Sequence, residues 1–137
     1  MQPVQVRRAR TADVTAVRRL VDTYTADRRL LSKATVVLYE DVPEFFVAES
    51  ASAVVGCGAL HVMWEDLAEV RTLAVDPAHH GRGIGSTLLA RLIEAARDLG
   101  VSRVFCLTFE TAFFAQHGFE VVDDVAVDPV VAAELLH

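Results

Sequence analysis

Residues 68–93 read AEVRTLAVDPAHHGRGIGSTLLARLI, and this stretch decides the fold. It begins as an apolar strand, passes through a turn with glycines at 81, 83 and 85, and continues as an amphipathic helix. Glycines let the backbone bend tightly and approach a ligand, and the start of a helix presents N–H groups and a positive dipole end to an anion. This order therefore predicts a cradle for a phosphorylated ligand.

Two common phosphate-binding motifs do not fit the spacing of these glycines. A dinucleotide fingerprint counted from Gly81 needs glycine at its sixth position, but Ser86 occupies that position. A nucleoside triphosphate loop needs lysine before its Ser or Thr, but Gly85 is followed directly by Ser86 and Thr87. An ordinary glycine-rich turn is the remaining alternative, although three alternating glycines are a costly way to make one.

The segment Leu73-Ala74-Val75-Asp76-Pro77, followed by His80-Gly81-Arg82-Gly83-Ile84-Gly85, resembles the coenzyme A loop of the GNAT superfamily of N-acetyltransferases. The resemblance implies that acetyl-CoA is the co-substrate. The residues expected to hold it are Leu73, Ala74, Val75, His80, Gly81, Arg82, Gly83, Ile84, Gly85 and Ser86. It also implies that the Val75 N–H polarises the thioester carbonyl. The main departure is His80, where family members usually have Arg or Gln.

Further stretches look like the short, single-domain amino-acid N-acetyltransferases of the N-acetylglutamate synthase type. They are residues 6–11, 55–61, 69–75, 107–111 and 117–119. This resemblance implies acetylation of the α-amine of L-glutamate, the first step towards arginine, by one domain that covers residues 1–137. Glutamine, another amino acid or a protein N-terminus stays open as acceptor, and so does a non-catalytic acyl-CoA-binding regulator.

Hydrophobic periodicity and turn residues predict the remaining elements. Strands are expected at 4–10, 45–49, 53–62, 69–75, 104–108 and 119–122. Helices are expected at 35–41, from Ile84, and after Thr11 and Thr111, which are each expected to cap the helix that follows. Gly100 and Gly118 are expected to end the last two helices, and Gly56 and Gly58 to mark a bulge or close packing. The predicted fold is α/β (α+β), with a central mixed, mostly antiparallel sheet flanked by helices, and this element order is that of the GNAT superfamily.

The last fifteen residues do not fit this pattern. Residues 123–137 are expected to form an acidic link and a terminal helix at 131–136, where the superfamily usually has another strand. The missing strand would then be absent, or a neighbouring subunit would supply it, as in a homodimer.

Glu69 is the candidate general base, because several superfamily members keep a glutamate at its spacing from Ala74. A solvent-facing strand carboxylate is the alternative. Arg71 and Lys33 are favoured over Arg28 and Arg29 as partners for the carboxylates of an acidic substrate, and Glu110 is a candidate for the ammonium group. Many relatives carry a tyrosine four residues before Gly118, where it protonates the leaving thiolate. Here that residue is Phe114, which cannot donate a proton.

Composition limits the other functions. A net charge of −6 without a long basic run argues against nucleic acid and anionic membrane as partners. The partner that the resemblance implies is a small-molecule amino acid. No segment reaches the roughly 18 apolar residues of a membrane span, and the N-terminus lacks a signal-peptide run, so a cytoplasmic location is expected.

Cys57 and Cys106 are expected to be reduced core thiols. His61 and His117 are expected to be packed or surface residues, and His79-His80 lacks a third ligand, so no metal is expected.

Overall fold

The computed structural model describes residues 3–25, 34–108, 110–123 and 130–135. Its elements are β1 (Val4–Arg8), η1 (Thr11–Asp13), α1 (Val14–Thr25), α2 (Thr35–Glu40), η2 (Val42–Glu44), β2 (Phe45–Ser50), β3 (Ala53–Trp64), β4 (Leu67–Val75), η3 (Pro77–His79), α3 (Ile84–Leu99), β5 (Arg103–Leu107), α4 (Thr111–Ala115), β6 (Glu120–Asp123) and β7 (Val130–Glu134). The chain falls into a first unit, residues 1–59 with 72–91, and a second unit, residues 60–71 with 92–137. Within the described residues, no helix is long and apolar enough to cross a membrane.

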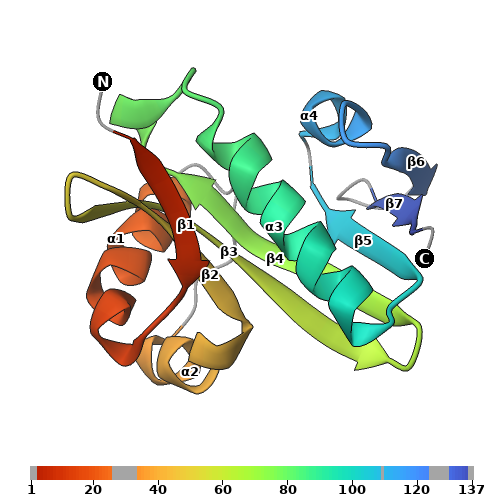
Figure 1. The fold of residues 1–137 in the computed structure, drawn as a ribbon, viewed down its shortest axis with the longest axis horizontal. Coiled ribbons are helices and arrows are strands. Elements are labelled where there is room, and N and C mark those ends of the chain that lie inside the picture. Colours follow the sequence, from red (N-terminus) through yellow and green to blue (C-terminus); the bar gives the residue numbers. More distant parts are fainter. Residues whose placement is uncertain (1–2, 26–33, 109, 124–129, 136–137) are drawn as a thin grey trace. The chain divides into compact units, whose positions relative to one another are not determined.

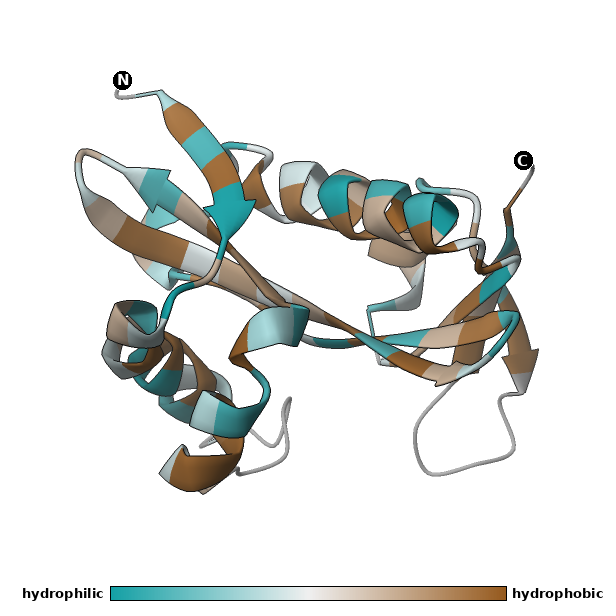
Figure 2. Ribbon diagram, turned by 60° about the horizontal axis from the view of Figure 1, so that its bottom comes forward, coloured by the Kyte–Doolittle hydropathy of each residue, from teal (hydrophilic) through white to brown (hydrophobic). Residues whose placement is uncertain are grey.

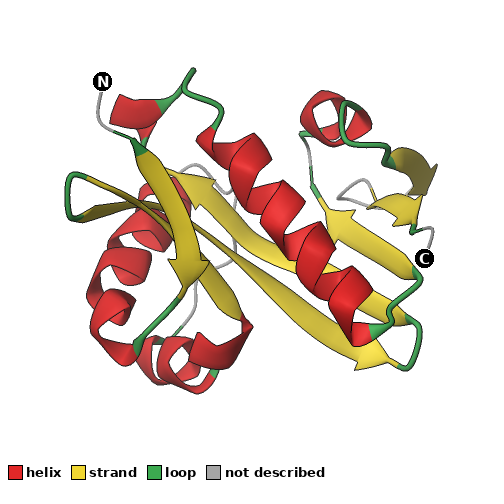
Figure 3. Cartoon of the chain, viewed as in Figure 1, coloured by secondary structure: helices red, strands yellow, loops and turns green. Residues whose placement is uncertain are grey.

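Seven strands form a sheet in the order β1-β2-β3-β4-β5-β7-β6 (Figures 1 and 3). The pairs β1–β2, β2–β3, β5–β7 and β6–β7 are antiparallel, whereas β4 and β5 are parallel. A parallel pair needs a crossover connection, which the chain makes through α3. The expected fold class, a mixed and mostly antiparallel sheet flanked by helices, is confirmed.

The core of the first unit depends on the amphipathic pattern of α1. Val17, Leu20, Val21 and Tyr24 recur at helical spacing and are all buried. They pack in one cluster with buried residues of α2, β2, β3 and β4. Figure 2 shows the two-sided character of the helices as alternating hydrophobic and hydrophilic bands. This packing brings the C-terminal end of α1 to the end of β4.

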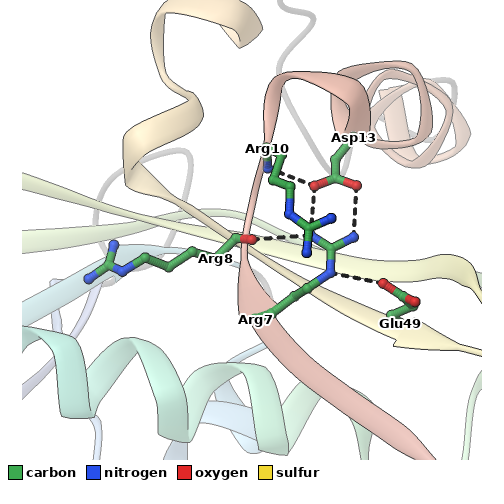
Figure 4. A network of polar contacts seen from close by, with 5 residues as sticks. All are labelled: Arg7, Arg8, Arg10, Asp13 and Glu49. Atoms are coloured by element: carbon green, nitrogen blue, oxygen red, sulfur yellow. Dashed lines mark hydrogen bonds and ion pairs between the residues drawn. The ribbon is translucent and has the colours of Figure 1, made fainter.

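A charged network fixes the other end of α1 (Figure 4). The guanidinium of Arg7 donates to both carboxylate oxygens of Asp13, at 2.8 and 3.0 Å, and to Glu49 at 2.8 Å. The Asp13 carboxylate also accepts the amide of Arg10 at 2.7 Å. The prediction that Thr11 caps the helix is wrong, because Thr11 is the first residue of η1 and the Asp13 carboxylate bonds the preceding amide instead.

Gly56 serves both of the roles considered for it. The register between β2 and β3 shifts after Ala48 pairs with Gly56, so that Val55 is an extra residue in β3. The carbonyl of this bulged residue accepts the Asp76 amide at 2.8 Å. A Cβ added at Gly56 would lie 3.0 Å from the Leu88 side chain. The bulge and the missing side chain therefore let β3 lie close to the end of β4 and the start of α3.

The second unit corrects the prediction for the C-terminal residues. Residues 130–134 form strand β7 rather than part of a terminal helix, and they pair with β5 on one side and β6 on the other. Val131, Ala132 and Ala133 are buried. A short apolar run cannot be assigned to helix or strand by periodicity alone, and here pairing with two neighbouring strands decides the outcome. The chain itself therefore supplies the strand that seemed to be missing.

The remaining element predictions differ only at their boundaries. Gly100 ends α3 with φ of 87°, and the Val101 amide bonds back to Ala96 O at 3.0 Å, as expected of a glycine cap. Thr111 is the first residue of α4 rather than its cap, a position that Glu110 takes. Both cysteines are free and buried, as predicted. Burial raises the pKa of the Cys57 and Cys106 thiols to about 12.

Candidate active site

The glycine turn between β4 and α3 has the backbone conformation that its sequence suggested. Gly81 and Gly83 have φ values of 82° and 74°, in the left-handed region that side chains disfavour. A Cβ at either position would meet no heavy atom within 4 Å, so the requirement is conformational rather than one of space. Gly85 is the second residue of α3 and lies within the helix.

The glycine turn leads directly into the N-terminus of α3, a helix of 16 residues. The Thr87 amide bonds to Gly83 O at 3.0 Å, so Ile84, Gly85 and Ser86 form the first turn. The first N–H groups of a helix have no partner within it and point along the axis with the positive dipole end. The predicted residues of the turn and the first helical turn thus lie together at this helix N-terminus in the first unit, a geometry that suits an anion.

The Arg82 side chain is turned towards neighbours in the first unit. Its Nη1 lies 2.6 Å from Nδ1 of His79, and its Nη2 lies 3.5 Å from the hydroxyl oxygen of Ser50. A guanidinium only donates, so Nδ1 of His79 is the acceptor. These contacts brace the turn against β2.

His80 has a partner that the sequence did not reveal. Its Nε2 lies 2.9 Å from the hydroxyl oxygen of Tyr24, and that hydroxyl also bonds to the carbonyl of Val75. The sequence placed Tyr24 only on the apolar face of α1. Its ring is buried as expected, and the missed signal is that it is the one member of that face with a polar tip.

The last residues of β4 alternate between the core and the partly exposed side. Ala74 is buried in the core cluster of the first unit, while Leu73 and Val75 are half-buried. Thr72 has φ of 55°, which is rare for a β-branched residue, and its carbonyl accepts the Cys57 thiol. Register pairing of β4 with β5 runs from Leu67 to Glu69, so Leu73 and Val75 lie beyond it.

Glu69 and Arg71 form an ion pair within the second unit. The Arg71 Nε donates to Oε1 of Glu69 at 2.5 Å, which confirms that they share a face of β4. The Glu69 residue is only 8% exposed, so it is not the solvent-facing carboxylate of the alternative interpretation. The pKa of Cys106 is raised first by the burial of its own thiol and second by the negative charge of Glu69. A buried carboxylate beside a partly exposed cation suits proton transfer and binding of a carboxylate ligand.

Other predicted residues have varied placements. Lys33, Arg28 and Arg29 lie outside the described residues. Glu110 is exposed at the start of α4. Phe114 is buried in the second unit, with its ring centroid 5.1 Å from that of Phe119. Among the described residues, no group of three or more His, Cys, Asp or Glu side chains is placed to hold a metal ion.

Comparisons with known proteins agree with this geometry. A family model described as "Acetyltransferase (GNAT) family" matches residues 14–119. An amino-acid acetyltransferase of Mycobacterium tuberculosis is 56% identical over 133 residues, which cover 95% of this chain and 76% of that protein.

Solved structures show the same similarity. The Mycobacterium tuberculosis protein Rv2747, in complex with CoA and NLQ, is 45% identical with a TM-score of 0.90, covering 96% of this chain and 99% of the other. An N-acetylglutamate synthase from Neisseria gonorrhoeae, complexed with coenzyme A and N-acetyl-glutamate, is 26% identical with a TM-score of 0.92, covering 100% of this chain and 36% of the other. The coenzyme A in both complexes agrees with the expected co-substrate. Because the family model spans most of the chain and the geometry of the glycine turn fits it, this chain belongs to the GNAT family of acetyltransferases.

Proposed function

We propose that residues 1–137 form one N-acetyltransferase domain that moves the acetyl group of acetyl-CoA to the α-amine of L-glutamate, the first step towards arginine. The observation that carries the proposal is the left-handed turn at Gly81 and Gly83, which opens directly into α3. The 56% identity with an amino-acid acetyltransferase supports an amino acid as acceptor. Glutamate is favoured by the resemblance to N-acetylglutamate synthases and by the cation of Arg71.

In the proposed reaction the neutral amine attacks the thioester carbonyl carbon, a C–N bond forms, and the C–S bond breaks to release the CoA thiolate. Amides of the glycine turn and of the first turn of α3 hold the pyrophosphate. The Val75 N–H polarises the thioester carbonyl, and backbone groups near Leu73 and Val75, beyond the register pairing of β4 with β5, bond the pantetheine amides as an added strand would.

Glu69 takes the proton that the ammonium group of the acceptor must lose, directly or through water. Arg71, which pairs with Glu69 on the same strand face, is proposed to bind a substrate carboxylate. Lys33 is proposed for the other carboxylate. Phe114 has no hydroxyl, so the thiolate takes its proton from water or another group, or leaves unassisted.

One observation favours a second candidate, a non-catalytic acyl-CoA-binding regulator. Phe114 stands where many relatives have the proton-donating tyrosine, and its buried ring packs against Phe119 as a structural residue does. Such a regulator would bind acetyl-CoA without turning it over.

The test combines calorimetric titration of acetyl-CoA with free-thiol detection, using glutamate, glutamine and an uncharged amine as acceptors. We expect binding of acetyl-CoA, and fastest thiol release with glutamate. In Glu69→Gln, kcat should fall by about 10²-fold or more, because a general base contributes roughly 10²- to 10⁴-fold, while acetyl-CoA still binds. Glu65→Gln, in the exposed β3–β4 turn, is the matched control and should keep parental kcat.

Each other outcome rejects part of the proposal. Binding without turnover of any acceptor favours the regulator. Equal turnover of uncharged amines removes the role given to Arg71 and Lys33. Parental kcat in Glu69→Gln removes the role given to that carboxylate.

A further inference from the structure

Tyr24 joins α1 to both sides of the η3 turn, within the first unit. Its hydroxyl bonds to the carbonyl of Val75, the last residue of β4, and to Nε2 of His80, the residue before the glycine turn. The ring packs in the core cluster, and the residue is 8% exposed. One rigid side chain therefore touches both of the segments that hold the proposed acyl-CoA ligand.

Counting protons fixes the direction of these two bonds. A phenol carries one proton, and a carbonyl oxygen only accepts, so the Tyr24 proton points to Val75 O. The contact with His80 must then be a bond that the phenol oxygen accepts, which requires a proton on Nε2 of His80. Nδ1 is the ring nitrogen that Tyr24 does not engage.

The anchoring of α1 makes this contact a firm one. At the N-terminal end of the helix, Arg7 and Asp13 tie the start of α1 to β1. Along its length Val17, Leu20 and Val21 are buried in the core. The Tyr24 hydroxyl is thus held on a fixed helix rather than on a loop, and it transmits that position to the backbone at Val75 and to the imidazole of His80.

We infer that Tyr24 is a positioning residue of the acyl-CoA site, which holds the end of β4 and the His80 imidazole in the arrangement that binds the pyrophosphate-bearing donor. This inference rests on the proposed function, because Val75 and His80 matter here as ligand-holding residues. Tyr24 acts through these two residues and does not itself take part in acetyl transfer.

A double-mutant cycle on CoA affinity tests the inference. Tyr24→Phe keeps the buried ring and removes only the hydroxyl with its two hydrogen bonds, so the protein should stay folded. It should bind CoA about tenfold more weakly, because part of the free energy of these bonds is lost from the ordered site. His80→Ala should weaken binding similarly. If Tyr24 acts mainly through His80, adding Tyr24→Phe to His80→Ala should cost much less than it does in the parent. Tyr39→Phe, which removes an exposed hydroxyl on α2, is the matched control and should bind CoA as the parent does.

Kinetics and spectroscopy supply independent readouts. Tyr24→Phe should raise the KM for acetyl-CoA and leave the KM for glutamate unchanged. In the parent protein, ¹⁵N NMR of the imidazoles should show a proton on Nε2 of His80, a result that does not depend on any variant folding.

Parental CoA affinity in Tyr24→Phe, or a neutral His80 with its proton on Nδ1, would overturn the inference. Penalties that multiply in the double variant would overturn the part that acts through His80 and leave only the contact with the Val75 carbonyl. Absence of CoA binding by the parent would instead reject the proposed function.

Discussion

Gly83 and Gly100 share a backbone conformation but differ in position. Their φ values are 74° and 87°, and a Cβ at either would meet no atom within 4 Å. Gly83→Ala and Gly100→Ala should therefore each lower the free energy of unfolding by a similar amount, about 1–2 kcal/mol, through backbone strain alone. Only Gly83→Ala should also weaken CoA binding, because it moves backbone amides at the N-terminus of α3. Thermal unfolding and calorimetric titration of both variants provide the measurement, and equal CoA affinity in the two would contradict the anion-binding role of the turn.

Individual residues of the site were predictable from sequence to different degrees. The glycine turn was predictable because few residues other than glycine adopt positive φ without strain, so the spacing itself carries the information. The left-handed Thr72 was not, because threonine rarely adopts that conformation and only the surrounding strands impose it. The Tyr24–His80 contact was also missed, since it joins residues 56 positions apart that local patterns do not relate.

At the scale of the elements, the start of α1 depends on a carboxylate whose charge the fold stabilises. The hydrogen bonds from Arg7, followed by the bond from the Arg10 amide, hold the pKa of Asp13 below its ordinary value. A group whose pKa is lower in the folded state stabilises the fold above its unfolded pKa, about 3.9 for aspartate. That contribution is lost as the pH falls from that value through the lower, folded pKa.

The prediction for this network is that Asp13→Asn lowers the free energy of unfolding near neutral pH by about 1.5–3 kcal/mol, the range for hydrogen bonds to charged groups. The loss should shrink under acidic conditions, where the parent carboxylate is itself protonated. Denaturant unfolding at a series of pH values provides the measurement. Asp22→Asn is the comparison, because its partner Arg18 lies one turn away on the exposed face of α1 and such pairs contribute little. An equal effect of both substitutions would contradict the role given to the network.

The element order was predictable up to β6, because each element there has its own periodic pattern bounded by Gly, Pro or polar residues. Strand β7 was not predictable, since its sequence VVAAE carries neither clear alternation nor a helical face. Its pairing with β5 and β6 is a long-range property of the sheet. The caps of α1 and α4 were each misplaced for a smaller reason: a threonine that can cap a helix can equally well begin one.

At the scale of the whole molecule, three elements bear on whether residues 1–137 unfold as one domain. β3, β4 and α3 each contribute residues to both compact units, so unfolding either unit interrupts elements that the other unit needs. We therefore expect a single calorimetric transition whose van't Hoff and calorimetric enthalpies agree. CoA at a hundred times its Kd should stabilise that transition by about 2.7 kcal/mol, which corresponds to roughly 10 °C for a chain of this size. The shift should be smaller in Gly83→Ala at the same CoA concentration. Two separate transitions, with only one of them shifted by CoA, would show that the units unfold independently and that the single-domain proposal is wrong.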